Sequence, residues 1–172
     1  RQGRVIYLAT EGFYGAALRK RAWKESRGIT APVQVDFIKR SVNLLNLDEV
    51  EVLDDSIRNT GPVPALIIGD TYNLLTNGAN ENYATTASGV IASCRELNRS
   101  LGCAFLLLHH PGHDETGRER GSSALRAGAD FMAHITRKGM SVTVGDGKLD
   151  KTKDCSPFKP FTRRLMPFGD SL

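Results

Sequence analysis

Short apolar runs alternate with longer amphipathic stretches along the first two thirds of the chain. Each run is too short for a free-standing helix, and Gly, Pro or polar residues bound it, so the pattern predicts strands of a parallel sheet. The predicted strands are 5–9, 33–37, 64–71 and 103–108.

The stretches between these runs carry apolar residues at helical intervals. Val50, Leu53 and Ile57 share one face of a predicted helix at 48–58, whose early acidic and late basic residues suit the helix dipole. A second helix is predicted at 85–101, where Gly102 is a natural stop. A third begins near residue 13 and is closed by Gly28. Strands that alternate with helices imply an α/β fold, with a three-layer, mostly parallel sheet.

The remaining segments are more polar or more broken. The Asn-rich segment 71–84 is predicted to be an exposed loop, and the charged segment 114–121 a mobile loop. A short capped helix is expected at 122–126. Strand-like pieces separated by Gly or Pro follow, and they predict an antiparallel extension at the C-terminal edge of the sheet. These pieces are 131–136, 141–144, 148–153 and 161–165.

Composition bounds the class of protein. A chain of 172 residues with 40% hydrophobic content fits one domain, 1–172, with a sizeable core. The net charge of +4 suits a nucleic-acid or nucleotide binder, but it is ordinary for a soluble protein. Three cysteines without metal-ligand spacing favour a reducing, cytoplasmic compartment. No apolar run approaches the roughly 20 residues that span a bilayer, so no membrane partner is expected.

Polar side chains follow three of the predicted parallel strands. Glu11 comes after the first strand, Asp70 and Thr71 end another, and His109 and His110 end the last. Because the carboxyl ends of parallel strands meet at one edge of a sheet, these side chains could face one ligand. Nucleoside triphosphate hydrolysis needs an acid for Mg²⁺, a carboxylate that orients water, and a polar group near the γ-phosphate. The three strand ends supply each type.

Each of these residues, taken alone, also fits a structural role. Asp70 could form a cap or turn, and Glu11 could interact with the dipole of the following helix. The histidine pair could bind a metal with His113, although no acidic or cysteine partner lies nearby at ligand spacing. Lys151 and Lys153 alternate like the solvated face of an exposed strand.

Six segments in a fixed order carry a family resemblance. They are RVIYLATEG at 4–12, LIIGDT at 66–71, EN at 81–82, GCAFLLLHHPGH at 102–113, RGSSALR at 120–126 and KTKD at 151–154. Together they resemble the RecA-like P-loop ATPases of the plasmid and phage RepA hexameric helicase type, which are AAA family ATPases. The resemblance covers nearly the whole chain, and the ordered set is specific although no single segment is.

The resemblance implies ATP and Mg²⁺ as cofactors and assigns roles around them. Glu11 is similar to the family's water-activating glutamate. Asp70, followed by Thr71, resembles the Walker B aspartate that holds Mg²⁺ through water. Either His109 or His110 resembles the sensor that links the γ-phosphate to the DNA-facing loop.

The resemblance also implies a homo-oligomer, a hexameric ring with single-stranded DNA in its channel. Lys151 and Lys153 resemble paired basic residues that reach the neighbouring subunit's nucleotide as an arginine finger does, and Arg126 is a second candidate. Arg118 and Arg120 lie in the loop that binds single-stranded DNA in such rings.

One element of the family pattern is missing from the sequence. No G-x-x-x-x-G-K-[ST] occurs in the 172 residues, and family members carry it just before the position of Arg1. We therefore expect a single RecA-like ATPase core that lacks the upstream P-loop strand and helix and is inactive alone. Gly69 also replaces the bulky residue expected before the Walker B aspartate.

The resulting prediction is a DNA motor that hydrolyses ATP, a replicative DNA helicase or helicase-like ATPase of plasmid or phage type, located in the cytoplasm. The alternative is a non-catalytic RecA-like module for DNA binding or oligomerisation that has lost hydrolysis. A third possibility is an α/β enzyme that uses the histidine cluster for another reaction.

Overall fold

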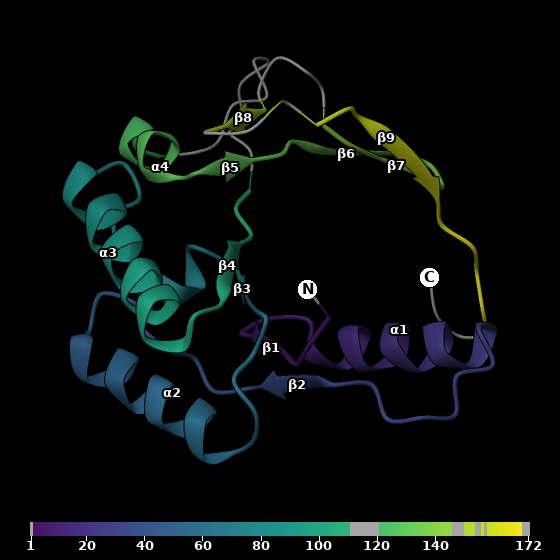
Figure 1. The fold of residues 1–172 in the computed structure, drawn as a ribbon. Helices are drawn as coiled ribbons and strands as arrows, with labels where there is room; N and C mark the ends of the chain where they lie inside the picture. Colours follow the sequence, from purple (N-terminus) through teal and green to yellow (C-terminus); the bar gives the residue numbers. More distant parts are fainter. Residues whose placement is uncertain (1, 111–120, 146–149, 154–155, 157, 170–172) are drawn as a thin grey trace.

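A parallel sheet of four strands is the centre of the molecule (Figure 1). The computed structural model describes residues 2–110, 121–145, 150–153, 156 and 158–169. The strand order is β2-β1-β3-β4, and all three pairings are parallel. The strands are β1 (Val5–Ala9), β2 (Val35–Ile38), β3 (Leu66–Asp70) and β4 (Ala104–Leu107).

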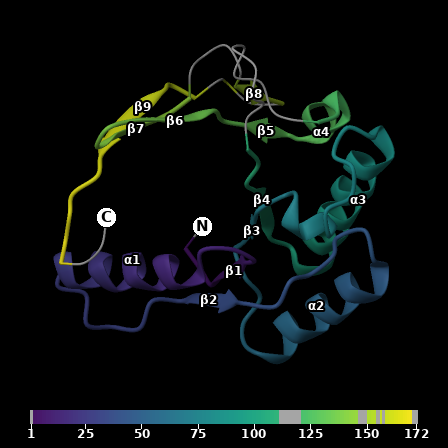
Figure 2. The same ribbon diagram turned by 180° about the vertical axis from the view of Figure 1, so that it is seen from behind.

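Helices lie on both faces of this sheet, so the predicted three-layer α/β fold is confirmed (Figures 1 and 2). The long helices are α1 (Phe13–Ser26), α2 (Leu47–Asn59) and α3 (Ala84–Leu101). The core lies between the sheet and the pair α2 and α3, where Leu8, Ile67 and Val90 are fully buried. By contrast, α1 has no buried residue and lies along the other face. In the part of the chain that the structure describes, no helix is long and apolar enough to cross a membrane.

The ends of the helices follow local chemistry. The Asn46 side chain caps α2 by accepting hydrogen bonds from the backbone N–H groups of Asp48 and Glu49. Gly102 ends α3 with φ 61°, a left-handed conformation that glycine adopts without strain. Both helices match the predicted segments within one or two residues.

The antiparallel strands expected near the C-terminus are present, but they form two sheets of their own. β5 (Phe131–Met132) pairs with β8 (Lys151–Thr152), and β6 (Ile135–Lys138), β7 (Ser141–Val144) and β9 (Phe161–Arg164) form a three-stranded sheet. The capped helix α4 (Ser123–Gly128) precedes them. These elements form an arch from α4 towards the end of α1 (Figure 2). Among the described residues, none of these strands bonds to β4, so β4 is an edge strand.

Two expectations about burial are wrong. The segment 71–84 is not an exposed loop, since Tyr72 and Leu75 are buried and a short 3₁₀ helix, η1 (Leu74–Thr76), joins the core. Gly69 leaves room for this packing, because a Cβ added there would lie 2.6 Å from Leu75 Cδ1. In addition, β4 is not fully buried, and Leu106 is 41% exposed because the strand lies at the edge of the sheet.

The packing of β3 yields a stability prediction. Ile67→Ala should lower the free energy of unfolding by about 2–5 kcal/mol, because Ile67 is completely buried and truncation leaves a cavity. Leu47→Ala is the matched control, since Leu47 is 74% exposed, and it should change stability by less than about 0.5 kcal/mol. Urea unfolding followed by circular dichroism measures both, and similar losses would contradict the position of the core.

Candidate active site

Hydrogen bonds continue past the ends of the strands and hold the segments that follow them together. The Thr10 backbone N–H donates to the Asp70 carbonyl oxygen at 3.1 Å, and the Leu108 N–H donates to the Gly69 carbonyl at 2.8 Å. The Tyr72 N–H donates to the Leu108 carbonyl oxygen at 2.8 Å. The carboxyl ends of β1, β3 and β4 therefore form one continuous edge, as the sequence predicts.

Glu11 and His110 meet at this edge. Glu11 Oε1 lies 3.8 Å from His110 Nε2, and both side chains are about half exposed or more. The pair forms an ion pair when the imidazole is protonated. The two residues come from opposite ends of the sequence-predicted set, and the fold brings them together beside an open surface.

Asp70 is held by a residue that sequence reasoning missed. The Tyr7 hydroxyl donates to Asp70 Oδ2 at 2.7 Å, and the Thr10 hydroxyl donates to the Asp70 carbonyl oxygen. Burial, followed by the hydrogen bond to Asp70, raises the pKa of Tyr7 to about 12. Tyr7 is therefore a neutral donor at physiological pH. The available signal was a tyrosine within an apolar strand, where the hydroxyl needs a partner.

The two histidines point to different surroundings. The His109 ring packs edge-on against Tyr72, with the ring centroids 4.8 Å apart. Tyr72 is itself buried, and burial raises its pKa, with a smaller contribution from the charge of Glu81. His109 is thus anchored towards the core, whereas His110 extends to Glu11.

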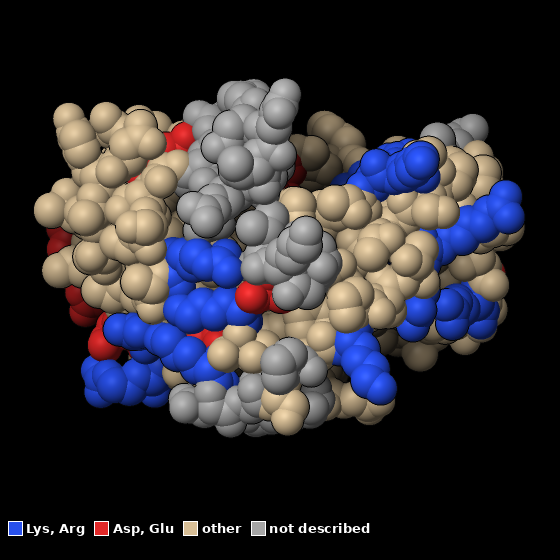
Figure 3. All heavy atoms as spheres, turned by 90° about the horizontal axis from the view of Figure 1, so that it is seen from above, with Lys and Arg blue, Asp and Glu red and all other residues tan. Residues whose placement is uncertain are grey.

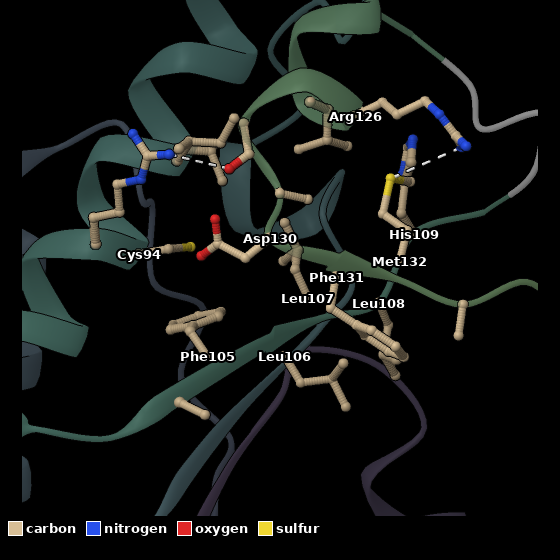
Figure 4. A pocket seen from close by; sticks show the side chains of 18 of the residues that line it. Cys94, Phe105, Leu106, Leu107, Leu108, His109, Arg126, Asp130, Phe131 and Met132 are labelled. Atoms are coloured by element: carbon tan, nitrogen blue, oxygen red, sulfur yellow. Dashed lines mark hydrogen bonds between the residues drawn. The ribbon is translucent and has the colours of Figure 1, made fainter. Parts of the chain in front are cut away.

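A pocket of about 600 Å³ opens beside β4 (Figure 4). Apolar side chains from β4 line it together with Cys94, whose pKa burial raises to about 12. Both histidines and Arg126 also line this pocket, and Arg126 Nη1 lies 4.0 Å from Met132 Sδ. The pocket therefore joins the strand ends to α4 and β5.

Lys151 and Lys153 form a second group with α4. Lys151 Nζ donates to the carbonyl oxygens of Arg126 and Ala127 at 2.5 and 3.0 Å. Desolvation, followed by the charges of Lys153 and Arg126, lowers the pKa of Lys151. Lys153 Nζ lies 3.4 Å from Asp130 Oδ1. In the described part of the chain, no contact joins these lysines to Glu11 or to Asp70.

The structure permits a limited test of the metal expectation. Among the described residues, no group of three or more His, Cys, Asp or Glu side chains could hold a metal ion. Mg²⁺ does not need such a cage, because one or two carboxylates together with water and phosphate oxygens satisfy it. Asp70 fits this requirement, since Tyr7 occupies only its Oδ2 atom, and the Thr71 hydroxyl lies next to it in the chain. Arg118 and Arg120 lie outside the described residues.

The Tyr7 hydrogen bond predicts a pH effect. The pKa of Tyr7 is raised from 10.0 to about 12 in the folded protein, so its contribution to stability is complete below pH 10 and is lost as the pH rises towards 12. Ultraviolet titration of tyrosinate should show a late component that Tyr7→Phe removes. Tyr14→Phe is the control, because Tyr14 is 82% exposed on α1 and should leave that component intact. Persistence of the late component in Tyr7→Phe would contradict the assignment.

Comparison with known proteins agrees with this architecture. Solved structures match in 48 chains, and one of them is the ATPase domain of a phage replicative helicase. That match covers 92% of this chain and 69% of the other, with a TM-score of 0.63 and 12% sequence identity. At this identity the likeness shows the fold alone. A search of curated protein sequences finds no match.

A family model provides the assignment. The model described as an AAA domain matches residues 1–116, a span that contains all three strand ends of the candidate site. The predicted recognition of a RecA-like ATPase is thereby confirmed at the level of family and fold. The chain belongs to the AAA domain family of ATPases.

Proposed function

We propose that this chain is the core of an ATP-hydrolysing DNA motor, a replicative DNA helicase or helicase-like ATPase of plasmid or phage type that acts in the cytoplasm. One observation carries the proposal. The register of β1 and β3, together with the backbone bonds to the β4 end, gathers Glu11, Asp70 and His110 at one edge of the sheet. The shared edge accounts for residues that lie far apart in the sequence.

In the proposed reaction, Glu11 orients the attacking water and Asp70 positions Mg²⁺ through water. The Tyr7 hydroxyl holds Asp70 Oδ2 and leaves Oδ1 to face the ligand. Bound Mg²⁺ would supply charge neutralisation on the phosphate oxygens. Because the transition state of phosphoryl transfer is loose, positioning and charge suffice without a covalent intermediate.

We assign the sensor role to His110 rather than to His109. His110 reaches the Glu11 carboxylate, so it can report on the group that orients the water. His109 packs on Tyr72 instead, which suits it to support the turn after β4.

The basic residues divide between a role within the subunit and a role between subunits. Lys151 is held by the carbonyl oxygens at the end of α4, which supports a role in positioning that helix. Lys153 is 37% exposed, with one aspartate at 3.4 Å, and it is the better candidate for a finger that reaches a neighbouring subunit of a ring. Arg126 lines a pocket of its own subunit. The phosphates are proposed to rest on a P-loop, a sequence that the 172 residues do not contain.

The roles of the two carboxylates predict the outcome of removing their charge. Asp70→Asn and Glu11→Gln should each lower DNA-stimulated ATP turnover of the full-length protein by ~100-fold or more. Asp55→Asn and Glu51→Gln remove the same groups from the exposed face of α2 and should leave turnover unchanged. Magnesium titration should show a higher Mg²⁺ concentration for half-maximal turnover only in Asp70→Asn.

Unchanged turnover in Asp70→Asn would overturn the proposed site. DNA binding by a full-length protein that never hydrolyses ATP would instead support the non-catalytic module. Circular dichroism spectra of the variants should match the parent, which separates loss of chemistry from loss of fold.

A role of Lys153 between subunits predicts rescue by mixing. Lys153→Gln and Asp70→Asn should each be inactive alone, whereas mixed oligomers should regain part of the ATP turnover. In such a mixture, an intact site on the Lys153→Gln subunit meets an intact lysine on its neighbour. Mixing Asp70→Asn with Glu11→Gln is the control, because both changes damage the same subunit's proposed site and the rescue should be smaller. Equal turnover in both mixtures would place Lys153 in its own subunit's site.

A further inference from the structure

The three-stranded sheet β6-β7-β9 is separate from the proposed ATPase site and is unusually exposed. Every residue of β6 and β9 is exposed, and the middle strand β7 is half-buried along most of its length. A sheet with two solvated faces contributes little apolar burial to the core. Its surface chemistry is therefore open to a partner.

The strand register sorts the side chains of this sheet onto two different faces. Side chains that pair directly across antiparallel strands share a face, and alternate residues along a strand do the same. We call one surface the Phe161 face, and it consists of Ile135, Val144 and Phe161 in one row and Arg137, Val142 and Arg163 in the next. The opposite surface, the threonine face, consists of Thr136, Thr143, Thr162, Lys138, Ser141 and Arg164.

The Phe161 face combines an exposed aromatic ring with two guanidinium groups. Phe161 is 43% exposed, and the Arg163 guanidinium carbon lies 4.9 Å from the centroid of its ring. Ile135, in the same row, is 55% exposed. Arg137 and Arg163 flank β7 on its two sides, so their backbones lie roughly 10 Å apart, twice the spacing of neighbouring strands. The face can therefore contact more than one anionic group beside a flat apolar row.

The charge around this sheet has one sign. The described residues 135–145 and 158–169 contain five cationic side chains and no carboxylate. These cations are Arg137, Lys138, Lys159, Arg163 and Arg164. In the described part of the chain, no carboxylate pairs with any of them, and Arg137 and Arg163 donate to backbone carbonyl oxygens instead. Seen from above, blue side chains stand out at several places on the right-hand half of the surface, and red ones are scarce (Figure 3).

We propose that the Phe161 face of the β6-β7-β9 sheet binds single-stranded nucleic acid, with Phe161 stacking on a base and Arg137 and Arg163 contacting phosphates. An aromatic platform beside cations is the combination that binds single strands without sequence preference. A base in a duplex is stacked on its neighbours and cannot lie flat on Phe161. An acidic peptide would use the cations but would leave the aromatic row without a partner.

This surface rests on the proposed function only in that both involve nucleic acid. It does not include the strand ends that carry Glu11 and Asp70, and it does not depend on ATP. Binding is therefore measured without nucleotide, so that loss of ATPase activity and loss of this interaction are separate results.

The sheet itself provides a matched pair of variants. Arg137→Gln with Arg163→Gln removes two cations from the Phe161 face, and Lys138→Gln with Arg164→Gln removes two from the threonine face. Fluorescence anisotropy with labelled oligothymidylate, repeated over a range of KCl concentrations, measures the affinity and its salt dependence. The Phe161-face pair should weaken binding by about tenfold or more and reduce the salt slope by about 1.4, at about 0.7 per lost phosphate contact. The threonine-face pair should alter both much less.

Phe161→Leu separates stacking from charge. It should weaken oligothymidylate binding by roughly 5- to 150-fold and leave the salt slope unchanged, because a leucine cannot stack on a base but removes no cation. Phe168→Leu is the aromatic control, since Phe168 is exposed but lies outside the sheet, and it should bind as the parent does. Circular dichroism establishes that the variants are folded.

Three results would overturn the inference. Equal losses in the two double variants would mean that charge alone attracts the strand and that the face has no specific role. Unchanged binding in the Phe161-face pair would place the nucleic acid elsewhere on the molecule. Preferential binding of polyglutamate, or of vesicles containing phosphatidylserine, with no oligothymidylate binding would identify a different partner.

Discussion

The pairing of β1 with β3 fixes the relative positions of the groups on which the proposed chemistry depends. Ala9 pairs with Asp70, and the Thr10 N–H continues the ladder by one bond to the Asp70 carbonyl. A shift of one residue would turn every side chain of β1 to the opposite face. It would break the Tyr7–Asp70 hydrogen bond and would also expose Leu8, which is completely buried. Core packing and site geometry are thus specified by the same register.

The two faces of the parallel sheet have different tasks. Ile6, Leu8 and Ile67 face α2 and α3 and form the core, whereas Tyr7 and Asp70 lie on the side of α1, which buries none of its own residues. Stability therefore comes mainly from one face. The other face can hold a carboxylate and a hydroxyl at partial exposure, where a ligand can reach them. This division explains how a small sheet supports both a dry core and a polar edge.

Much of the fold could be predicted because hydrophobic pattern and turn chemistry agreed locally. The capping residue Asn46 lies where the acidic start of α2 implies it, and Gly102 ends α3 as expected. The segment after Asp70 was misjudged because its asparagines dominate the composition, while its burial depends on Tyr72 and Leu75 packing against a sheet that the local pattern does not contain. The Glu11–His110 contact was foreseeable only as a shared edge. The bonds of Lys151 to α4 are long-range contacts with no sequence periodicity to announce them.

The position of α4 has a mechanical consequence. Its C-terminal carbonyl oxygens accept hydrogen bonds from Lys151, its Arg126 side chain lines the pocket that also holds both histidines, and the Lys153 backbone is bonded to Asp130 just beyond it. A rigid displacement of α4 that keeps these bonds must carry Arg126 and the two lysines as one body. The same displacement would change the shape of the pocket beside β4. The basic residues and the strand ends are therefore coupled through a single short helix, without a direct contact between them.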